Sequence, residues 1–335
     1  MILEKIGNYK YILFFIFLSC ILSTTYIYFK IVSRHDKGRE IVNILGNESA
    51  HSKYIRQNFV LDPTSLRKRK VFSNIIRKKI NELEMQNKAQ SISVFFSDLS
   101  TLTRVEINPG IKYVPASLLK LPLMIAGLKI AETSPKVMTN KYLVTKDYAE
   151  KIAPSITGTK SLEIGKSYTY FEILSYAVVY SDNKAALFLR DLLMKYNYEI
   201  YKEIFTNFDM DFPDDLEANN VEFKTTATDM GRFFRILYNC NYLSPQYSGL
   251  ALKILVSSEY KKGLAKYLPP KTEIAHKFGA FGNGQYFEMH DCGIVYAQNH
   301  PYILCIMSRG KKFDNLSDAI GEISKAVYDE MEKQE

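Results

Sequence analysis

The sequence predicts an α+β fold: an antiparallel five-stranded sheet, helices from both chain ends, and an all-helical region inserted between the strands. Two helical patterns frame this arrangement, one at residues 71–85 and one at 314–333. Five other segments have the alternation or the β-branched and aromatic composition of strands. They lie at 91–99, 103–109, 272–279, 290–298 and 301–309.

The long middle of the chain carries the helical insertion. Four segments there have apolar residues at helical spacing. The first begins near Ser117, and the other three lie at 170–180, 183–195 and 226–238. The order of helix, two strands, helical middle, three strands and helix therefore predicts a helical subdomain at about 132–270.

The composition indicates a globular protein with room for one large domain or two modest ones. The chain has 335 residues, 47% of them hydrophobic, and its 16 Gly and 11 Pro exclude collagen-like and disordered classes. Its four cysteines, Cys20, Cys240, Cys292 and Cys305, form no CxxC pair and have no zinc spacing. Three are interpreted as buried thiols and one, Cys20, as part of an apolar segment, and a pairing of Cys292 with Cys305 on neighbouring strands is left open.

The net charge of +8 is concentrated near the N-terminus. Residues 1–90 hold 16 Lys and Arg against 7 Asp and Glu, whereas the rest of the chain is nearly neutral. A basic segment beside an apolar span favours attraction to anionic lipid headgroups. No interleaved aromatic stripe and no known motif indicates nucleic acid as a partner.

Residues 11–29 carry no charge and are long enough to cross a hydrocarbon core of about 30 Å. With 1–10 as its N-terminal flank, this segment is predicted to be an uncleaved transmembrane anchor. The alternatives are a cleaved signal peptide and lipoprotein-type cleavage at Cys20, but no clear cleavage site follows and the residues after Cys20 stay apolar. Residues 30–70, which end in RKRK, are predicted to be a basic linker.

The stretch VPASLLKLPLMIA, residues 114–126, places Ser117 and Lys120 inside an apolar run. Pro115 favours an early helical position, so Ser117 is expected in the first turn, on the same face as Lys120. A lysine desolvated beside apolar residues has a lowered pKa and acts as a base, so the two form a nucleophile and its activator. The alternative is a helix-cap serine followed by a lysine whose ammonium group reaches solvent.

Two further polar motifs follow at a distance. The tripeptide SDN at 181–183 begins the next helical pattern, where an N-cap cluster without a function is the alternative. Lys277 ends a run of strand formers and precedes Gly279, where a backbone can approach a ligand closely. An ordinary lysine on an edge strand is the alternative for Lys277.

Together these stretches resemble the S-x-x-K, S-D-N and K-T-G motifs of class A β-lactamases and penicillin-binding serine hydrolases. The segment TTATDMGRFFRIL at 225–237 also resembles the part of this family that follows its omega loop. The resemblance covers 71–333. It implies a single domain with a β-lactamase/transpeptidase-like fold, in which no metal and no cofactor takes part.

The resemblance also implies a role for each motif residue. Ser117 attacks a carbonyl carbon and forms an acyl-enzyme, and Lys120 accepts the hydroxyl proton directly or through water. Ser181 passes a proton to the leaving nitrogen, and Lys277 supplies positive charge at the substrate carboxylate.

Substrate binding is implied for three more positions. Asn183 hydrogen-bonds the side-chain amide of the substrate. The backbone N–H groups of Ser117 and Ala280 form an oxyanion hole, and Gly279 lies on the strand that lines it.

Two departures from the family pattern bear on activity. Phe278 stands where the family has Thr or Ser, whose hydroxyl helps to bind the substrate carboxylate. The glutamate that activates the deacylating water has an approximate counterpart in Glu217, because Asn220 follows it one residue too early. Asp214 and Asp215 are the fallback candidates, and a solvated acidic loop is the alternative.

The sequence therefore predicts a serine hydrolase that opens the β-lactam ring through an acyl-enzyme on Ser117. The alternatives are a membrane-anchored D-Ala-D-Ala carboxypeptidase or transpeptidase acting on peptidoglycan stem peptides, and a non-catalytic wall sensor. We expect a monomer with a single span in the cytoplasmic membrane and its catalytic domain outside the cytoplasm. The count of flanking Lys and Arg favours the opposite orientation, but wall peptides and β-lactams are met outside that membrane.

Overall fold

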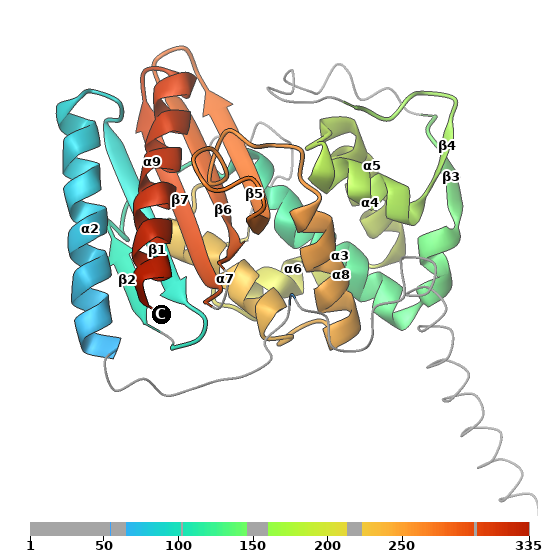
Figure 1. Cartoon of the computed structure of the whole chain (residues 1–335). Helices are drawn as coiled ribbons and strands as arrows, with labels where there is room; N and C mark the ends of the chain where they lie inside the picture. Colours follow the sequence, from blue (N-terminus) through green and yellow to red (C-terminus); the bar gives the residue numbers. More distant parts are fainter. Residues whose placement is uncertain are drawn as a thin grey trace, which may run out of the picture. The chain divides into compact units, whose positions relative to one another are not determined.

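The computed structural model of the chain covers the predicted catalytic domain (Figure 1). It describes Tyr54 and residues 65–101, 103–145, 160–212, 223–297 and 300–334. All of these belong to one compact unit, Ser49–Glu335. The predicted anchor at 11–29 lies outside the described residues. Within the described part, no helix has the length and apolar character that a membrane crossing requires.

A five-stranded sheet forms the centre of this unit. Its strands are β1 (Ser91–Asp98), β2 (Arg104–Ile107), β5 (Glu273–Gly282), β6 (Phe287–Tyr296) and β7 (Tyr302–Gly310). The order is β2-β1-β7-β6-β5, and every neighbouring pair is antiparallel. The predicted sheet is confirmed, and β1 joins the N-terminal hairpin to the three C-terminal strands by pairing with β7.

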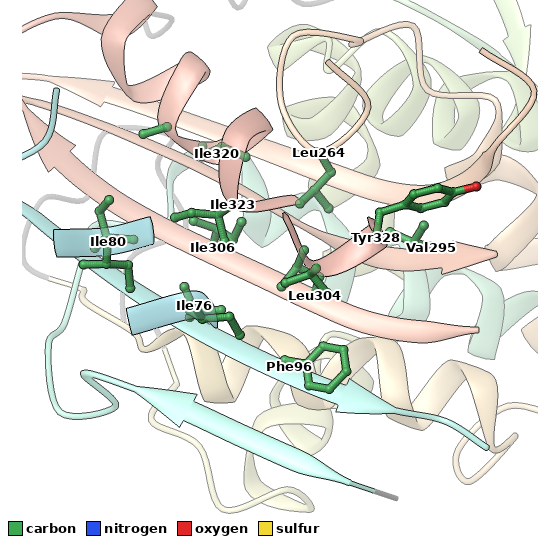
Figure 2. Packing of buried hydrophobic residues seen from close by; sticks show 14 of the residues in the cluster. Ile76, Ile80, Phe96, Leu264, Val295, Leu304, Ile306, Ile320, Ile323 and Tyr328 are labelled. Atoms are coloured by element: carbon green, nitrogen blue, oxygen red, sulfur yellow. The ribbon is translucent and has the colours of Figure 1, made fainter. Parts of the chain in front are cut away.

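Two helices from opposite chain ends, α2 (Ser65–Met85) and α9 (Phe313–Met331), cover one face of the sheet (Figure 1). Their apolar sides meet strand residues in the main core cluster. Figure 2 shows this packing through Ile76 and Ile80 of α2, Leu304 and Ile306 of β7, and Ile320 and Ile323 of α9. Burial of these periodic apolar residues is what fixes both helices against the sheet.

The first helix begins at Ser65, earlier than the predicted start at residue 71. The RKRK stretch at 67–70 therefore belongs to the first turns of α2 and not to a linker. The sequence SLRKRK of these turns has a single apolar residue, Leu66, and therefore no periodic apolar pattern. Leu66 is itself 79% exposed, so it does not anchor the helix to the core.

The other face of the sheet meets the inserted region. Its helices are α3 (Lys120–Thr133), α4 (Tyr170–Val179), α5 (Asn183–Tyr196), α6 (Glu199–Thr206), α7 (Ala227–Tyr238) and α8 (Pro245–Val256). Helix α7 packs on β1, β6 and β7, and α8 packs on β5. This confirms the helical character of the insertion, although the sequence analysis identified neither α6 nor α8.

The insertion is not entirely helical. Strands β3 (Lys141–Leu143) and β4 (Ser167–Thr169) form a small antiparallel sheet. Each has three residues, too few to display an alternating pattern in the sequence. Short 3-10 turns, η2 (Pro135–Thr139) and η4 (Glu332–Gln334), follow α3 and α9.

Capping residues determine where two of the helices begin. Thr169 accepts a hydrogen bond from the backbone N–H of Glu172, whose side chain bonds back to the cap residue of α4. Thr226 and Asp229 form the same reciprocal capping box at the start of α7. Each box satisfies backbone N–H groups that would otherwise lack partners in the first turn.

Cys292 on β6 and Cys305 on β7 form a disulfide. The two residues are direct cross-strand partners and both are fully buried. The structure thus answers the question that the sequence left open for this pair. Among the described cysteines, Cys240 is a free thiol.

Gly231 on α7 allows a close contact with the sheet. A Cβ atom at this position would lie 2.3 Å from Cδ1 of Phe95 on β1. The fully buried Phe95 ring lies beneath two guanidinium groups, with Arg104 at 5.1 Å and Arg235 at 5.6 Å from its centroid. The ring therefore has little room to move away.

We expect Gly231→Ala to lower the free energy of unfolding by about 1–3 kcal/mol through overpacking, as measured by urea denaturation. Gly110→Ala is the matched control, because a Cβ atom there meets no heavy atom within 4 Å. The control should change the free energy of unfolding by less than about 0.5 kcal/mol. Equal effects of the two substitutions would contradict the close contact.

Candidate active site

Ser117 lies on a strained turn. The 3-10 turn η1 (Ala116–Leu119) precedes α3, so the α-helix begins at Lys120, and Ser117 lies in the turn before it and not in the first helical turn as predicted. Ala116 has a φ of 48°, a left-handed conformation that is uncommon for residues other than glycine. The left-handed residue immediately precedes Ser117, which is half-buried. Such strain persists where the surrounding structure imposes it, and it is concentrated at functional sites.

Lys120 is almost fully buried and contacts the SDN motif. Its Nζ atom donates to the carbonyl oxygen of Ser181 at 2.5 Å, to Oδ1 of Asn183 at 2.6 Å, and to Oγ of Ser181 at 3.3 Å. These three acceptors match the three donors of an ammonium group. Two of the predicted motifs, separated by more than sixty residues, are therefore joined directly.

Lys277 reaches the same hydroxyl from the sheet. Its Nζ atom donates to Oγ of Ser181 at 2.8 Å and to the carbonyl oxygen of Phe278 at 3.0 Å. The side chain is fully buried. Lys120 of the first motif, Ser181 of the second and Lys277 of the third thus converge, since the hydroxyl of Ser181 is within hydrogen-bond distance of both lysines. Among the described residues no hydrogen bond joins the hydroxyl of Ser117 to Lys120, so the pairing of these two as nucleophile and activator stays a prediction.

Burial makes both lysines weaker bases. It lowers the pKa of Lys120 to about 7, against the opposing influence of the Asp182 carboxylate. Burial, reinforced by the charge of Lys120, lowers the pKa of Lys277 well below its usual value, and Asp291 opposes this shift. A neutral amine can accept a proton, so a hydroxyl between two such amines can pass a proton from one side to the other.

The loop that carries Ser181 is held by Asp182. Ser181 has a φ of 54°, and Asp182 caps α5 by accepting two backbone N–H groups of its first turn. The same carboxylate accepts hydrogen bonds from the hydroxyl of Ser161 and the backbone N–H of Leu162, each at 2.9 Å. The sequence analysis places Asp182 in the SDN motif, with an N-cap cluster as the alternative, and nothing in the sequence indicates its second pair of partners.

Gly279 brings the edge strand β5 against the serine turn. A Cβ atom at this position would lie 2.4 Å from the carbonyl oxygen of Pro115 and 3.2 Å from the backbone nitrogen of Leu118. The close approach that the sequence analysis expected therefore involves the protein's own backbone. Ala280 follows on the same strand and is half-buried.

Phe278 packs in the core cluster and stacks on Tyr260, with ring centroids 4.1 Å apart. It supplies no hydroxyl to the site. Its ring also lies 4.1 Å from Nζ of Lys277, close enough for a cation–π interaction that favours the charged form of that lysine. An aromatic ring thus contacts the amine where a small hydroxyl side chain would be expected.

The predicted deacylating residue lies outside the described part of the chain. Glu217 and its fallbacks Asp214 and Asp215 fall between residues 212 and 223. Where the description resumes, Thr225 exchanges two backbone hydrogen bonds of 2.9 Å with Tyr113, four residues before Ser117. The segment after the acidic loop is therefore attached to the chain that leads into the serine turn.

Solved structures with the same architecture come from class A β-lactamases and a penicillin-binding protein. A mutant of PBP-A in an acyl-enzyme complex with penicillin G has a TM-score of 0.66 at 19% identity, and the match covers 78% of this chain and 97% of that one. A class A β-lactamase from Bacteroides cellulosilyticus has a TM-score of 0.67 at 17% identity, covering 78% and 99%. TLA-3 extended-spectrum β-lactamase has a TM-score of 0.65 at 18% identity, and the match covers 78% of this chain and 98% of that one. These similarities establish the β-lactamase/transpeptidase-like fold.

The family follows from the sequence itself. No curated protein sequence matches the chain. Residues 75–331 match the model of the beta-lactamase enzyme family. The fold and the three converging motifs define a serine hydrolase of β-lactamase type. The chain belongs to the beta-lactamase enzyme family.

The titration of Lys120 can be measured directly by NMR in protein labelled with ¹³C at the lysine Cε atoms. A resonance should titrate with a midpoint of about 7, since burial lowers the pKa of Lys120 to this value. The resonance should be missing from Lys120→Arg, because a guanidinium stays charged. Asp182→Asn should move the midpoint to lower pH, because it removes the opposing carboxylate. Titration of every lysine near its usual pKa would contradict this arrangement.

Proposed function

We propose that the chain hydrolyses β-lactams through an acyl-enzyme on Ser117. The observation that carries this proposal is the position of the Ser181 hydroxyl between two buried amines, at 2.8 Å from Lys277 and 3.3 Å from Lys120. A structural serine does not require two buried lysines, and burying ionisable amines costs free energy. Strongly shifted pKa values of this kind are concentrated at sites that transfer protons at neutral pH.

Acylation uses the two amines in sequence. Oγ of Ser117 bonds to the lactam carbonyl carbon while its proton passes to the neutral amine of Lys120, directly or through water. The backbone N–H groups of Ser117 and Ala280 stabilise the oxyanion. The carbon–nitrogen bond of the ring then breaks, and Ser181 gives its proton to the departing nitrogen and regains one from a neighbouring lysine.

Lys277 and Asn183 bind the substrate in this proposal. A bound substrate carboxylate favours the charged form of Lys277, which then attracts it. Phe278 offers no hydroxyl to assist in this binding. Asn183 hydrogen-bonds the side-chain amide of the substrate. Glu217 activates the water that releases the acyl group. Rapid release is what separates a β-lactamase from a penicillin-binding acyltransferase of the same fold.

Two variants test the roles of the motif residues. Ser117→Ala should abolish covalent labelling by a fluorescent penicillin, because the attacking oxygen is gone. Lys120→Ala should slow labelling by a factor on the order of 10³, the scale expected for losing the activator of a nucleophile. Both variants should keep the circular dichroism spectrum of the unaltered protein. Labelling at the original rate in both would refute the assignment.

The fate of the adduct distinguishes the candidate functions. Rapid hydrolysis of a chromogenic β-lactam by the full chain supports the β-lactamase, and Glu217→Gln should then leave the acyl group on Ser117. A long-lived adduct in the unaltered protein points instead to an enzyme that acts on peptidoglycan stem peptides. The absence of any adduct would leave the non-catalytic wall sensor as the remaining candidate function.

We also propose that the catalytic domain lies outside the cytoplasm and is attached to the membrane by the segment at 11–29. The Cys292–Cys305 disulfide supports this location, since disulfides persist mainly in oxidising compartments. A reporter fused after residue 335 that is active only in the cytoplasm would contradict the proposal, as would free thiols at both cysteines in protein taken from cells.

A further inference from the structure

Two buried side chains on β6 hold the main chain just before the serine turn. The backbone N–H of Val114 donates to Oε2 of Glu288 at 2.8 Å. The carbonyl oxygen of Val114 accepts from Nε2 of His290 at 3.0 Å. Both side chains are fully buried and neither belongs to a family motif. We call these two contacts the Val114 clamp.

The two clamp residues are themselves fixed in orientation. Arg309 on β7 donates to Oε1 of Glu288 through Nε at 2.8 Å and through Nη2 at 2.7 Å. The backbone N–H of Ser308 donates to Nδ1 of His290 at 3.3 Å, so the ring proton lies on Nε2, facing Val114. Burial lowers the pKa of His290 to about 4, which keeps this neutral tautomer at physiological pH.

The residues preceding Val114 are held in the same way. The carbonyl oxygen of Lys112 accepts from Nη2 of Arg309 at 3.3 Å, and Tyr113 exchanges both its backbone hydrogen bonds with Thr225. The ring of Tyr113 meets that of His290 edge to face, with centroids 5.4 Å apart. A shift of this segment would therefore break several buried hydrogen bonds at once.

The clamp ends two residues before Ala116, whose left-handed conformation is unfavourable by itself. If Val114 were free, the chain could relax by rotating at this position, and the hydroxyl of Ser117 would move. A displacement of about 1 Å at a reacting group can cost about 100-fold in rate. The Val114 clamp thus prevents the strained turn at Ala116 from relaxing.

We propose that Glu288 and His290 are positioning residues, which fix the strained turn and thereby the direction of the Ser117 hydroxyl. The inference rests on the proposed function, because it assigns these residues to acylation at Ser117. They touch neither the substrate nor the reacting atoms. Their effect should therefore fall on the limiting rate of acylation and not on the affinity for the β-lactam.

The decisive test compares two replacements of His290 in the full chain. His290→Gln retains an N–H donor for the Val114 carbonyl, whereas His290→Leu fills a similar volume without one. We expect Leu to lower the limiting rate of acylation by a fluorescent penicillin about 10- to 100-fold, with the apparent dissociation constant nearly unchanged. The limiting rate of acylation of His290→Gln should stay within a few-fold of that of the unaltered protein. A residue that served packing alone would give the opposite ranking.

Two further variants keep the test informative if His290→Leu does not fold. Arg309→Gln alters a partly exposed side chain and removes the guanidinium that orients Glu288, so it should lower the limiting rate several-fold. Asp98→Asn is the control, because Asp98 is also a fully buried carboxylate that accepts backbone N–H groups. It lies at the opposite end of β1 from Ser91, the residue that pairs with Arg309. Its limiting rate should be unchanged.

Amide exchange separates failure of the clamp from failure of the proposed function. Hydrogen exchange of the Val114 amide should accelerate at least tenfold in His290→Leu, or in Arg309→Gln, but not in Asp98→Asn. Unchanged exchange would overturn the clamp whatever the activity. Lack of labelling in the unaltered protein would instead overturn the proposed function. A normal limiting rate despite accelerated exchange would show that the clamp does not position Ser117.

Discussion

The site depends on the burial of two amine side chains around one hydroxyl. Lowering the pKa of Lys120 from 10.5 to about 7 corresponds to about 5 kcal/mol of unfavourable folding free energy. Between these pH values the unfolded chain binds more protons than the folded one, so the cost is complete below about pH 7 and fades as pH rises toward 10.5. Apolar packing on both faces of the sheet offsets this cost, which explains why an extensive core supports a small polar centre.

The pairing of the strands fixes the position of Lys277 in the active site. Lys277 lies opposite Cys292, Cys292 opposite Cys305, and Cys305 opposite Phe95, so these four residues form a row across four strands. The disulfide joins the middle two, and α7 holds Phe95 through its contact at Gly231. The amine of Lys277 is therefore placed by regular structure, which positions functional groups more accurately than loops do.

Periodic segments and motifs were predictable from the sequence, whereas contacts between distant segments were not. The strands and α9 were recognised because their apolar spacing repeats, and the three motifs do converge on Ser181. Strands β3 and β4 are too short to repeat, and Pro115 indicated an α-helix start where a 3-10 turn occurs. Glu288 and His290 alternate with apolar residues as solvent-facing positions do, yet both are buried under a turn 174 or more residues earlier in the chain.

The pairing of β1 with β7 also sets the order in which the molecule can be completed. Among the described strands, the β1–β2 hairpin has no neighbour in the sheet to pair with until β7 has left the ribosome, because β7 lies between the hairpin and β6 (Figure 1). The loop that this pairing closes contains the whole helical insertion, so its ends meet late and slowly. A nascent or truncated product that stops before Tyr302 therefore lacks both the finished sheet and the chemistry that depends on it.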